Sequence, residues 1–150
     1  SIKPQLSFVN RQLNILQRLV ERNSVEGAAK SHRLECTWFV RDCDRTDAET
    51  LLKDKADGTF LIRNSRQSGQ YALSIVCDRK VYHCLILKTG RGYGFSEPYD
   101  IHQSLMALVL HYSQTSLEEH NDNLTTTLKF PIFADSFEDH EEKSETACNA

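Results

Sequence analysis

The chain has 150 residues, enough for one domain with a hydrophobic core and some further sequence. Its formal net charge of −3 argues against a general nucleic-acid-binding protein, which needs a basic surface. No apolar run approaches the ~20 residues of a membrane span, and no signal peptide is visible. The five cysteines follow no disulfide or zinc spacing, which favours reduced thiols in a cytoplasmic protein. Because the chain begins with Ser1, we expect it to be a fragment of a larger protein.

Residues 2–22 are predicted to form a helix with a coiled-coil seam, because apolar residues recur at alternating spacings of four and three. The seam consists of Ile2, Leu6, Val9, Leu13, Leu16 and Val20. So much apolar surface requires a covering partner, which is either another helix or the domain that follows. Residues 23–35 show no apolar stripe and are predicted to be a linker.

The middle of the chain predicts an α+β domain in which one antiparallel sheet lies between two helices. The expected strands are 38–40, 60–63, 71–77, 81–87 and 124–133, and the expected helices are 45–55 and 101–112. Asp44 is the expected N-cap of the first helix, with Asp47 three residues on. Gly90, Gly92 and Gly94 predict a flexible loop. Residues 135–150 are predicted to be an acidic disordered tail.

Arg63 is the candidate functional residue, because it continues the apolar run of residues 60–62 and then a polar loop follows. A buried arginine is costly without an anion, and its guanidinium can grip two oxygens of a phosphate or a carboxylate. Ser65 and Ser68 in the loop add hydroxyls to such a site. A phosphate pocket and an internal salt bridge both remain open for Arg63.

Two further residues have both a functional and an ordinary interpretation. Arg45 falls in the first turn of a predicted helix, where a cation opposes the helix dipole, so it is either a solvated arginine or one aimed at an anion. His83 shares a strand face with Val81 and Leu85, whereas Cys84 points to the other face. Taken alone, His83 is a hydrogen-bonded core histidine or a ligand-binding one.

Several segments together resemble the SH2 domain family over residues 37–134. They are Thr37–Phe39, Gly58–Arg63, Ser65, Tyr71–Ser74, His83 and the helix that ends at His111–Tyr112. Further segments resemble the C-terminal SH2 domain of class I phosphoinositide 3-kinase regulatory subunits: Tyr93–Tyr99, Leu108–Tyr112, Thr115–Leu117 and His120–Asp122. Ser1–Pro4 and the seam resemble the end of the coiled coil between the two SH2 domains of those subunits. The resemblance implies an SH2 fold, with coiled-coil end and linker at 1–34, SH2 domain at 35–134 and tail at 135–150.

The resemblance implies a phosphotyrosine-binding role for four residues. Arg63 would grip the phosphate with two hydrogen bonds, and Ser65 would donate to it from the loop. Arg45 would approach the phosphate and the face of the tyrosyl ring, and His83 would line that ring. Asn64 and Arg66 depart from the family, which usually has an acid and a serine there, so further loop contacts to the phosphate stay open.

The resemblance also implies a second pocket for the third residue after the phosphotyrosine, which lies ~10 Å away in an extended peptide. Its residues would be Cys84, Tyr93, Phe95, Tyr112 and Leu117. A small Cys84 and an aromatic lining favour methionine, because sulfur contacts aromatic rings well. We therefore expect pTyr-x-x-Met peptides to bind, leucine in that position to bind more weakly and an acid to bind poorly.

Other functions fit the sequence less well. Cys84 and Arg91 have one residue too many between them for the cysteine-phosphatase motif, and Cys84 lies in a predicted strand, so we expect no enzyme. The glycines of residues 90–94 do not form a dinucleotide fingerprint, and no cofactor or metal is expected. An SH2 adaptor fragment that acts mainly through its coiled coil, with a degenerate phosphate pocket, is the alternative.

The resemblance implies a cytoplasmic regulatory role. The expected partners are tyrosine-phosphorylated receptors or adaptors and the catalytic subunit of phosphoinositide 3-kinase, with no nucleic acid. The membrane is reached only through these partners, when signalling recruits the kinase.

Overall fold

The computed structural model describes residue 12, residues 31–67 and residues 69–134. The predicted coiled-coil helix and acidic tail therefore lie outside the described residues, except that Gln12 is helical and exposed. In the part of the chain that the structure describes, no helix is long and apolar enough to cross a membrane.

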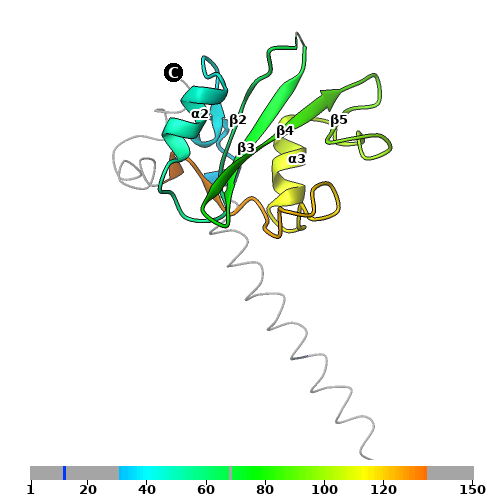
Figure 1. Cartoon of the computed structure of the whole chain (residues 1–150). Helices are drawn as coiled ribbons and strands as arrows, with labels where there is room; N and C mark the ends of the chain where they lie inside the picture. Colours follow the sequence, from blue (N-terminus) through cyan, green and yellow to red (C-terminus); the bar gives the residue numbers. More distant parts are fainter. Residues whose placement is uncertain (1–11, 13–30, 68, 135–150) are drawn as a thin grey trace, which may run out of the picture.

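A six-stranded mixed sheet forms the centre of the domain (Figure 1). Its strands are β1 (Phe39–Val40), β2 (Thr59–Asn64), β3 (Tyr71–Cys77), β4 (Lys80–Lys88), β5 (Tyr93–Gly94) and β6 (Phe130–Pro131). The order across the sheet is β1-β2-β3-β4-β5, and β6 pairs with β2. Strands β2 to β4 are antiparallel neighbours, as predicted. Strand β5, which falls in the predicted glycine loop, pairs antiparallel with β4, whereas β1 and β6 run parallel to β2.

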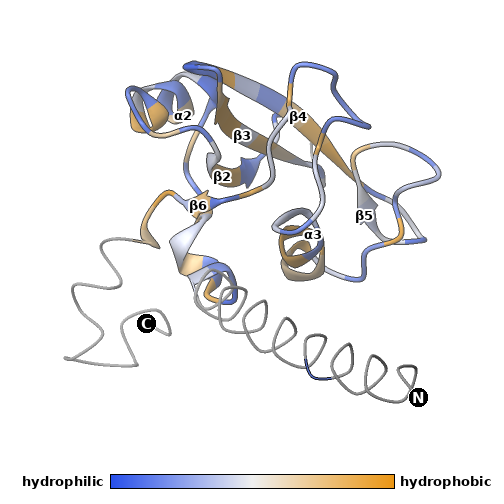
Figure 2. Cartoon of the chain, turned by 90° about the horizontal axis from the view of Figure 1, so that it is seen from below, coloured by the Kyte–Doolittle hydropathy of each residue, from blue (hydrophilic) through white to orange (hydrophobic). Residues whose placement is uncertain are grey.

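Helices α2 (Arg45–Leu52) and α3 (Leu105–Tyr112) lie on opposite sides of the sheet (Figures 1 and 2), so the α+β prediction with two flanking helices is confirmed. Strand alternation divides the core between the two faces. Phe60 and Ile62 of β2 pack in the cluster that contains α3, whereas Leu61 packs with Ala48 and Leu52 of α2.

Helix α2 begins as predicted, because Asp44 and Asp47 form a reciprocal capping box. The Asp44 carboxylate accepts from the Asp47 N–H at 2.8 Å, and the Asp47 carboxylate accepts from the Asp44 N–H at 3.2 Å. The helix ends at Leu52 rather than at Lys55, since Asp54 adopts a φ of +60° that a right-handed helix does not allow.

Helix α3 begins four residues later than predicted. Ser104 is its N-cap and accepts from the Ala107 N–H at 2.9 Å, whereas the backbone of His102 pairs with Tyr93 of β5. The segment is therefore tightly packed at Gly92 and Gly94 rather than a flexible loop there, whereas a side chain at Gly90 would meet nothing within 4 Å. A side chain at Gly92 would begin only 2.5 Å from the His102 carbonyl oxygen.

The predicted strand at 124–133 is mostly not a strand. Leu124, Thr126 and Leu128 alternate with less buried neighbours, as the sequence pattern indicated. Their backbone groups bond to a loop and a helix end instead of a strand: Leu117 N–H donates to Thr126 and Leu128 N–H donates to Tyr112. Only β6 joins the sheet. The alternation of apolar and polar residues thus predicted correctly which side chains are buried, but the prediction that their backbone bonds to a neighbouring strand was wrong.

The prediction of a linker over residues 23–35 missed contacts at its end. Ser31 and His32 are buried, and His32 Nε2 lies 2.6 Å from the Leu128 carbonyl oxygen. The Trp38 indole donates to the His32 carbonyl oxygen at 2.7 Å. The expectation of reduced thiols holds for Cys43, Cys77 and Cys84, which are free, and is wrong for Cys36, which is disulfide-bonded.

Candidate functional site

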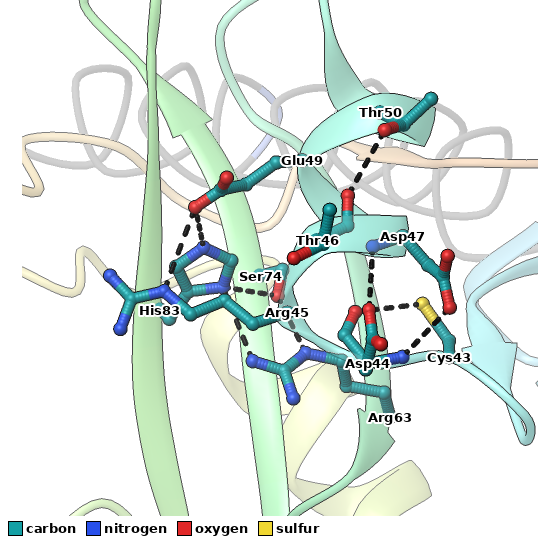
Figure 3. A network of polar contacts seen from close by, with 10 residues as sticks. All are labelled: Cys43, Asp44, Arg45, Thr46, Asp47, Glu49, Thr50, Arg63, Ser74 and His83. Atoms are coloured by element: carbon teal, nitrogen blue, oxygen red, sulfur yellow. Dashed lines mark hydrogen bonds and ion pairs between the residues drawn. The ribbon is translucent and has the colours of Figure 1, made fainter.

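Arg63 lies on the α2 face of the sheet, and it is only 6% exposed. The alternation that places Leu61 against α2 places Arg63 there too. In the β3–β4 ladder, Ser74 and His83 are direct partners. Both share the face of Arg63, so the sheet register gathers one arginine, one serine and one histidine under α2 (Figure 3).

These side chains form a connected network with Glu49 of α2, which we call the Arg63 cluster (Figure 3). Arg63 Nε donates to Ser74 Oγ at 3.1 Å, and Arg63 Nη2 lies 3.3 Å from His83 Nδ1. Ser74 Oγ lies 2.8 Å from His83 Nδ1, and His83 Nε2 lies 3.0 Å from Glu49 Oε1. A guanidinium can only donate, so His83 Nδ1 must accept, and the ring proton on Nε2 is donated to Glu49.

Arg63 has no ion pair with any carboxylate of the described residues. The hydrogen bonds to Ser74 and His83 use Nε and Nη2, and no described residue bonds to Nη1. Burial lowers the pKa of Arg63, and this desolvation together with the nearby cations Arg45 and Arg66 outweighs the opposing effects of Cys43 and Asp44. An internal salt bridge, left open by the sequence, is therefore absent from the described residues.

Arg45 and Ser65 stand beside the Arg63 cluster. Arg45 has a side chain that is 70% exposed, and its Nε lies 3.6 Å from the Glu49 carboxylate. Ser65, in the loop after β2, accepts from the Gln67 N–H at 3.2 Å, which leaves its hydroxyl proton available. Asn64, where the family usually has an acid, donates to the Arg41 carbonyl oxygen at 3.2 Å and ties the end of β2 to the preceding loop.

A second group of side chains, the aromatic cluster, lies on the α3 side. The ring centroids of Phe95 and Tyr112 are 5.0 Å apart, and His120 lies 5.3 Å from each of them. Tyr112 Oη is 2.7 Å from His120 Nε2, and the Tyr99 ring packs edge-on against His120. Tyr93 is partly buried beside the same core.

Two residues expected in the second pocket have different surroundings. Leu117 is 1% exposed and belongs to the core, so it supports the aromatic cluster from below rather than offering a free surface. Cys84 is partly buried on the α3 face and hydrogen-bonds Asn121. Burial raises the pKa of the Cys84 thiol, and Arg91 forms an ion pair with Asp100 at 3.4 Å. Cys84 and Arg91 therefore lack the activated thiolate that a cysteine phosphatase needs.

Sequence reasoning missed the roles of Glu49, Ser74, His120 and Asn121. Ser74 was within reach of sequence reasoning, because the two-residue turn at Asp78–Arg79 sets the register that pairs Ser74 with His83. Glu49 stands four residues after Arg45, which is a helical pair spacing, but only the packing of α2 on the sheet brings it to His83. His120 and Asn121 lie in a segment that carries the family resemblance, but the sequence assigned neither of them a role.

The comparisons with known proteins agree with this arrangement. The family profile of the SH2 domain matches residues 38–112. Similar relatives are the mouse guanine nucleotide exchange factor VAV3, 36% identical over 95 residues, and the Hydra vulgaris tyrosine-protein kinase HTK16, 34% identical over 98 residues. Each match covers 63% of this chain, but only 11% and 12% of those relatives, so the chain spans about a tenth of their length.

Two solved structures are also similar. One is the solution structure of the SH2 domain of human proto-oncogene protein VAV1, and the other is the VAV1 SH2 domain complexed with a tyrosine-phosphorylated peptide from SLP76. Each has a TM-score of 0.58 and 33% sequence identity, over 64% of this chain and 70% of the other.

Protonation of His83 should destabilise the fold. Burial lowers the pKa of His83 and opposes the Glu49 bond that raises it, and burial likewise lowers the pKa values of His102 and His120. The unfolded chain therefore binds more protons near pH 6. The free energy of unfolding is highest above ~6.5, which is the pKa of an unfolded histidine, and it falls as the pH drops from there through the lower pKa values of the folded state. Urea unfolding should give a lower free energy at pH 5.5 than at pH 7.5, and a smaller difference in His83→Gln. A difference of equal size in that variant would contradict the burial of a neutral His83.

Proposed function

The chain belongs to the SH2 domain family, and we propose that it is a non-catalytic module that binds tyrosine-phosphorylated peptides, with Arg63 and its neighbours as the phosphotyrosine site. The single observation that carries this proposal is a buried guanidinium with a free Nη1 and no carboxylate among the described residues. A phosphotyrosine carries about −1.5 to −2 charges at neutral pH and would neutralise it.

Each residue of the site has a distinct task in this proposal. Arg63 donates from Nη1 and Nη2 to two phosphate oxygens, while its Nε bond to Ser74 holds the guanidinium plane. Ser65 gives its hydroxyl proton to the phosphate. Arg45 swings from Glu49 to the phosphate and the ring face, which its exposure allows. His83 stays neutral and lines the tyrosyl ring.

The bound peptide would cross from one face of the sheet to the other. Strand β5 pairs only with Leu87 and Lys88 of β4, so the earlier part of that β4 edge has no strand partner among the described residues. His83 faces α2 and Cys84 faces α3 across this edge. Residues after the phosphotyrosine would pass over the edge beside Cys84 and reach the aromatic cluster, where methionine would contact Phe95.

We further propose that the chain is part of a regulatory subunit of a class I phosphoinositide 3-kinase. This rests on the sequence resemblance of residues 93–122 and of the N-terminal seam. The subunit would act in the cytoplasm, hold the catalytic subunit through the coiled coil, and be recruited to membranes by phosphorylated receptors or adaptors. The proposed division is coiled-coil end and linker at 1–34, SH2 domain at 35–134 and acidic tail at 135–150.

Loss of the guanidinium should abolish phosphate-dependent binding. In calorimetric titration with a pTyr-x-x-Met peptide, Arg63→Ala should lose about 2 to 5 kcal/mol of binding free energy, because it removes a buried bidentate contact to a charge. The binding free energy of Arg63→Lys should lie between those of the wild-type chain and Arg63→Ala, since an ammonium keeps the charge but cannot form the two parallel hydrogen bonds of a guanidinium. Equal binding of the phosphorylated and unphosphorylated peptides would refute the site.

The third residue after the phosphotyrosine should decide affinity through the aromatic cluster. Among peptides that differ only there, methionine should bind best, leucine more weakly, and glutamate about tenfold or more weakly than methionine, because a carboxylate would lose hydration against aromatic rings. Phe95→Ala should reduce the preference for methionine over leucine. A preference for glutamate would contradict the proposed methionine pocket.

The coiled-coil proposal is tested in a longer chain that includes the whole predicted coiled coil. It should copurify with a class I catalytic subunit, and Leu13→Asp with Leu16→Asp should lower the yield of complex, because charges disrupt an apolar seam. Arg63→Ala is the matched control and should copurify normally. Failure of the unmutated chain to copurify would favour an adaptor outside this kinase class.

A further inference from the structure

A cleft of about 560 Å³ lies between α2 and the beginning of β4, outside the proposed phosphotyrosine site. Its apolar lining comes from Leu52 of α2, Val76 of β3 and Val81 of β4. Leu52 and Val76 are almost fully buried and belong to the α2-side core, so the apolar lining of the cleft is a rigid part of the fold.

The rim of the cleft is positively charged. Lys53, Lys55 and Arg79 contribute three cations, and the acids that line the cleft are Glu49 and Asp54. The Glu49 carboxylate accepts a hydrogen bond from neutral His83 and lies 3.6 Å from Arg45, which offsets part of its charge. The lining therefore carries three cations against two acids, one of them partly offset, and this excess of positive charge suits an anionic ligand.

The backbone of Arg79, which lines the cleft, is held in place by the hairpin turn. Asp78 and Arg79 both have positive φ, at 52° and 62°, which fits the two-residue turn between β3 and β4. The Arg79 N–H also donates to the Asp57 carboxylate at 3.2 Å. Its backbone is therefore fixed, while its exposed side chain remains available to a ligand.

The cleft is continuous with the Arg63 cluster. Glu49 lines the cleft and bonds to His83, and Val81 stands two residues before His83 on the same face of β4. The aromatic cluster lies in the opposite direction along β4, because Phe95 directly follows Gly94, which pairs with Leu87. The order along this strand is cleft, Arg63 cluster, then the route to the aromatic cluster.

We propose that this cleft binds the residues on the N-terminal side of the phosphotyrosine and selects acidic side chains there. The inference rests on the proposed phosphotyrosine site. A peptide that leaves this site toward the aromatic cluster must leave it upstream toward the other side, where the cleft begins at Glu49. An extended chain advances ~3.3 Å per residue, so two to four upstream residues reach from the phosphotyrosine into the cleft.

The test compares three phosphopeptides with the same phosphotyrosine and downstream residues. The first begins at an acetylated phosphotyrosine, the second adds three upstream glutamates, and the third adds three upstream serines. By calorimetry at low salt, the glutamate peptide should bind about fivefold more tightly than the serine peptide, because several partly exposed charge pairs add modest energies. The difference should shrink in high salt.

A charge reversal locates the effect. Arg79→Glu should bring the fivefold preference to less than about twofold, while binding of the peptide that begins at the phosphotyrosine stays unchanged. Arg33→Glu changes the net charge equally at an exposed residue that does not line the cleft, and it should keep the preference. Independently of any variant, amide NMR signals of Lys53 and Lys55 in the wild-type chain should shift only with the upstream glutamates.

The outcomes separate the two proposals. Failure of the shortest phosphopeptide to bind would refute the phosphotyrosine site itself. Binding of all three peptides with equal affinity would refute the cleft inference alone. Binding of vesicles that contain phosphatidylserine, lost in Arg79→Glu and accompanied by no effect of upstream glutamates, would also refute it and assign the cleft to a membrane surface.

Discussion

Arg63 is a buried cation that forms no ion pair with a carboxylate of the described residues, and much of the surrounding structure serves to hold it. Burial disfavours its charge and lowers its pKa, and the more distant Asp44 carboxylate opposes this effect only in part. Ser74 and His83 orient the guanidinium with neutral partners, and Glu49 orients His83 in turn. The fold thus keeps an unfavourable charge that a phosphate dianion would stabilise, which is the expected relation between stability and function at a binding site.

The two faces of the sheet explain how one domain would recognise both a phosphate and a peptide sequence in the proposed function. The α2 face carries polar groups at Arg63 and His83, whereas the α3 face carries an apolar and aromatic surface. Strand alternation makes the change within two consecutive residues, His83 and Cys84. In this account the peptide crosses from the α2 face to the α3 face at the β4 edge. The domain would therefore contact the peptide backbone where β4 has no strand partner among the described residues.

The sequence predicted the central elements well, because their signals are local. The hairpin of β3 and β4, the Asp44 cap and the position of Arg63 after an apolar run follow from turn, capping and burial chemistry. Contacts between distant segments were not predictable in the same way. Helix packing brings Glu49 to His83, and β5 uses the backbone of His102, which delays α3. His120 joins Phe95 only through the loop that follows α3.

The most direct test of this account is the free energy of unfolding of Arg63→Met without any ligand, measured in urea at neutral pH. Methionine replaces the buried charge with an apolar chain, and Ser74 and His83 keep each other as hydrogen-bond partners at 2.8 Å. The account predicts a free energy that is unchanged or higher by about 1 kcal/mol, together with loss of phosphopeptide binding. A variant destabilised by about 3 kcal/mol or more would show that Arg63 forms a structural ion pair, and would contradict the account.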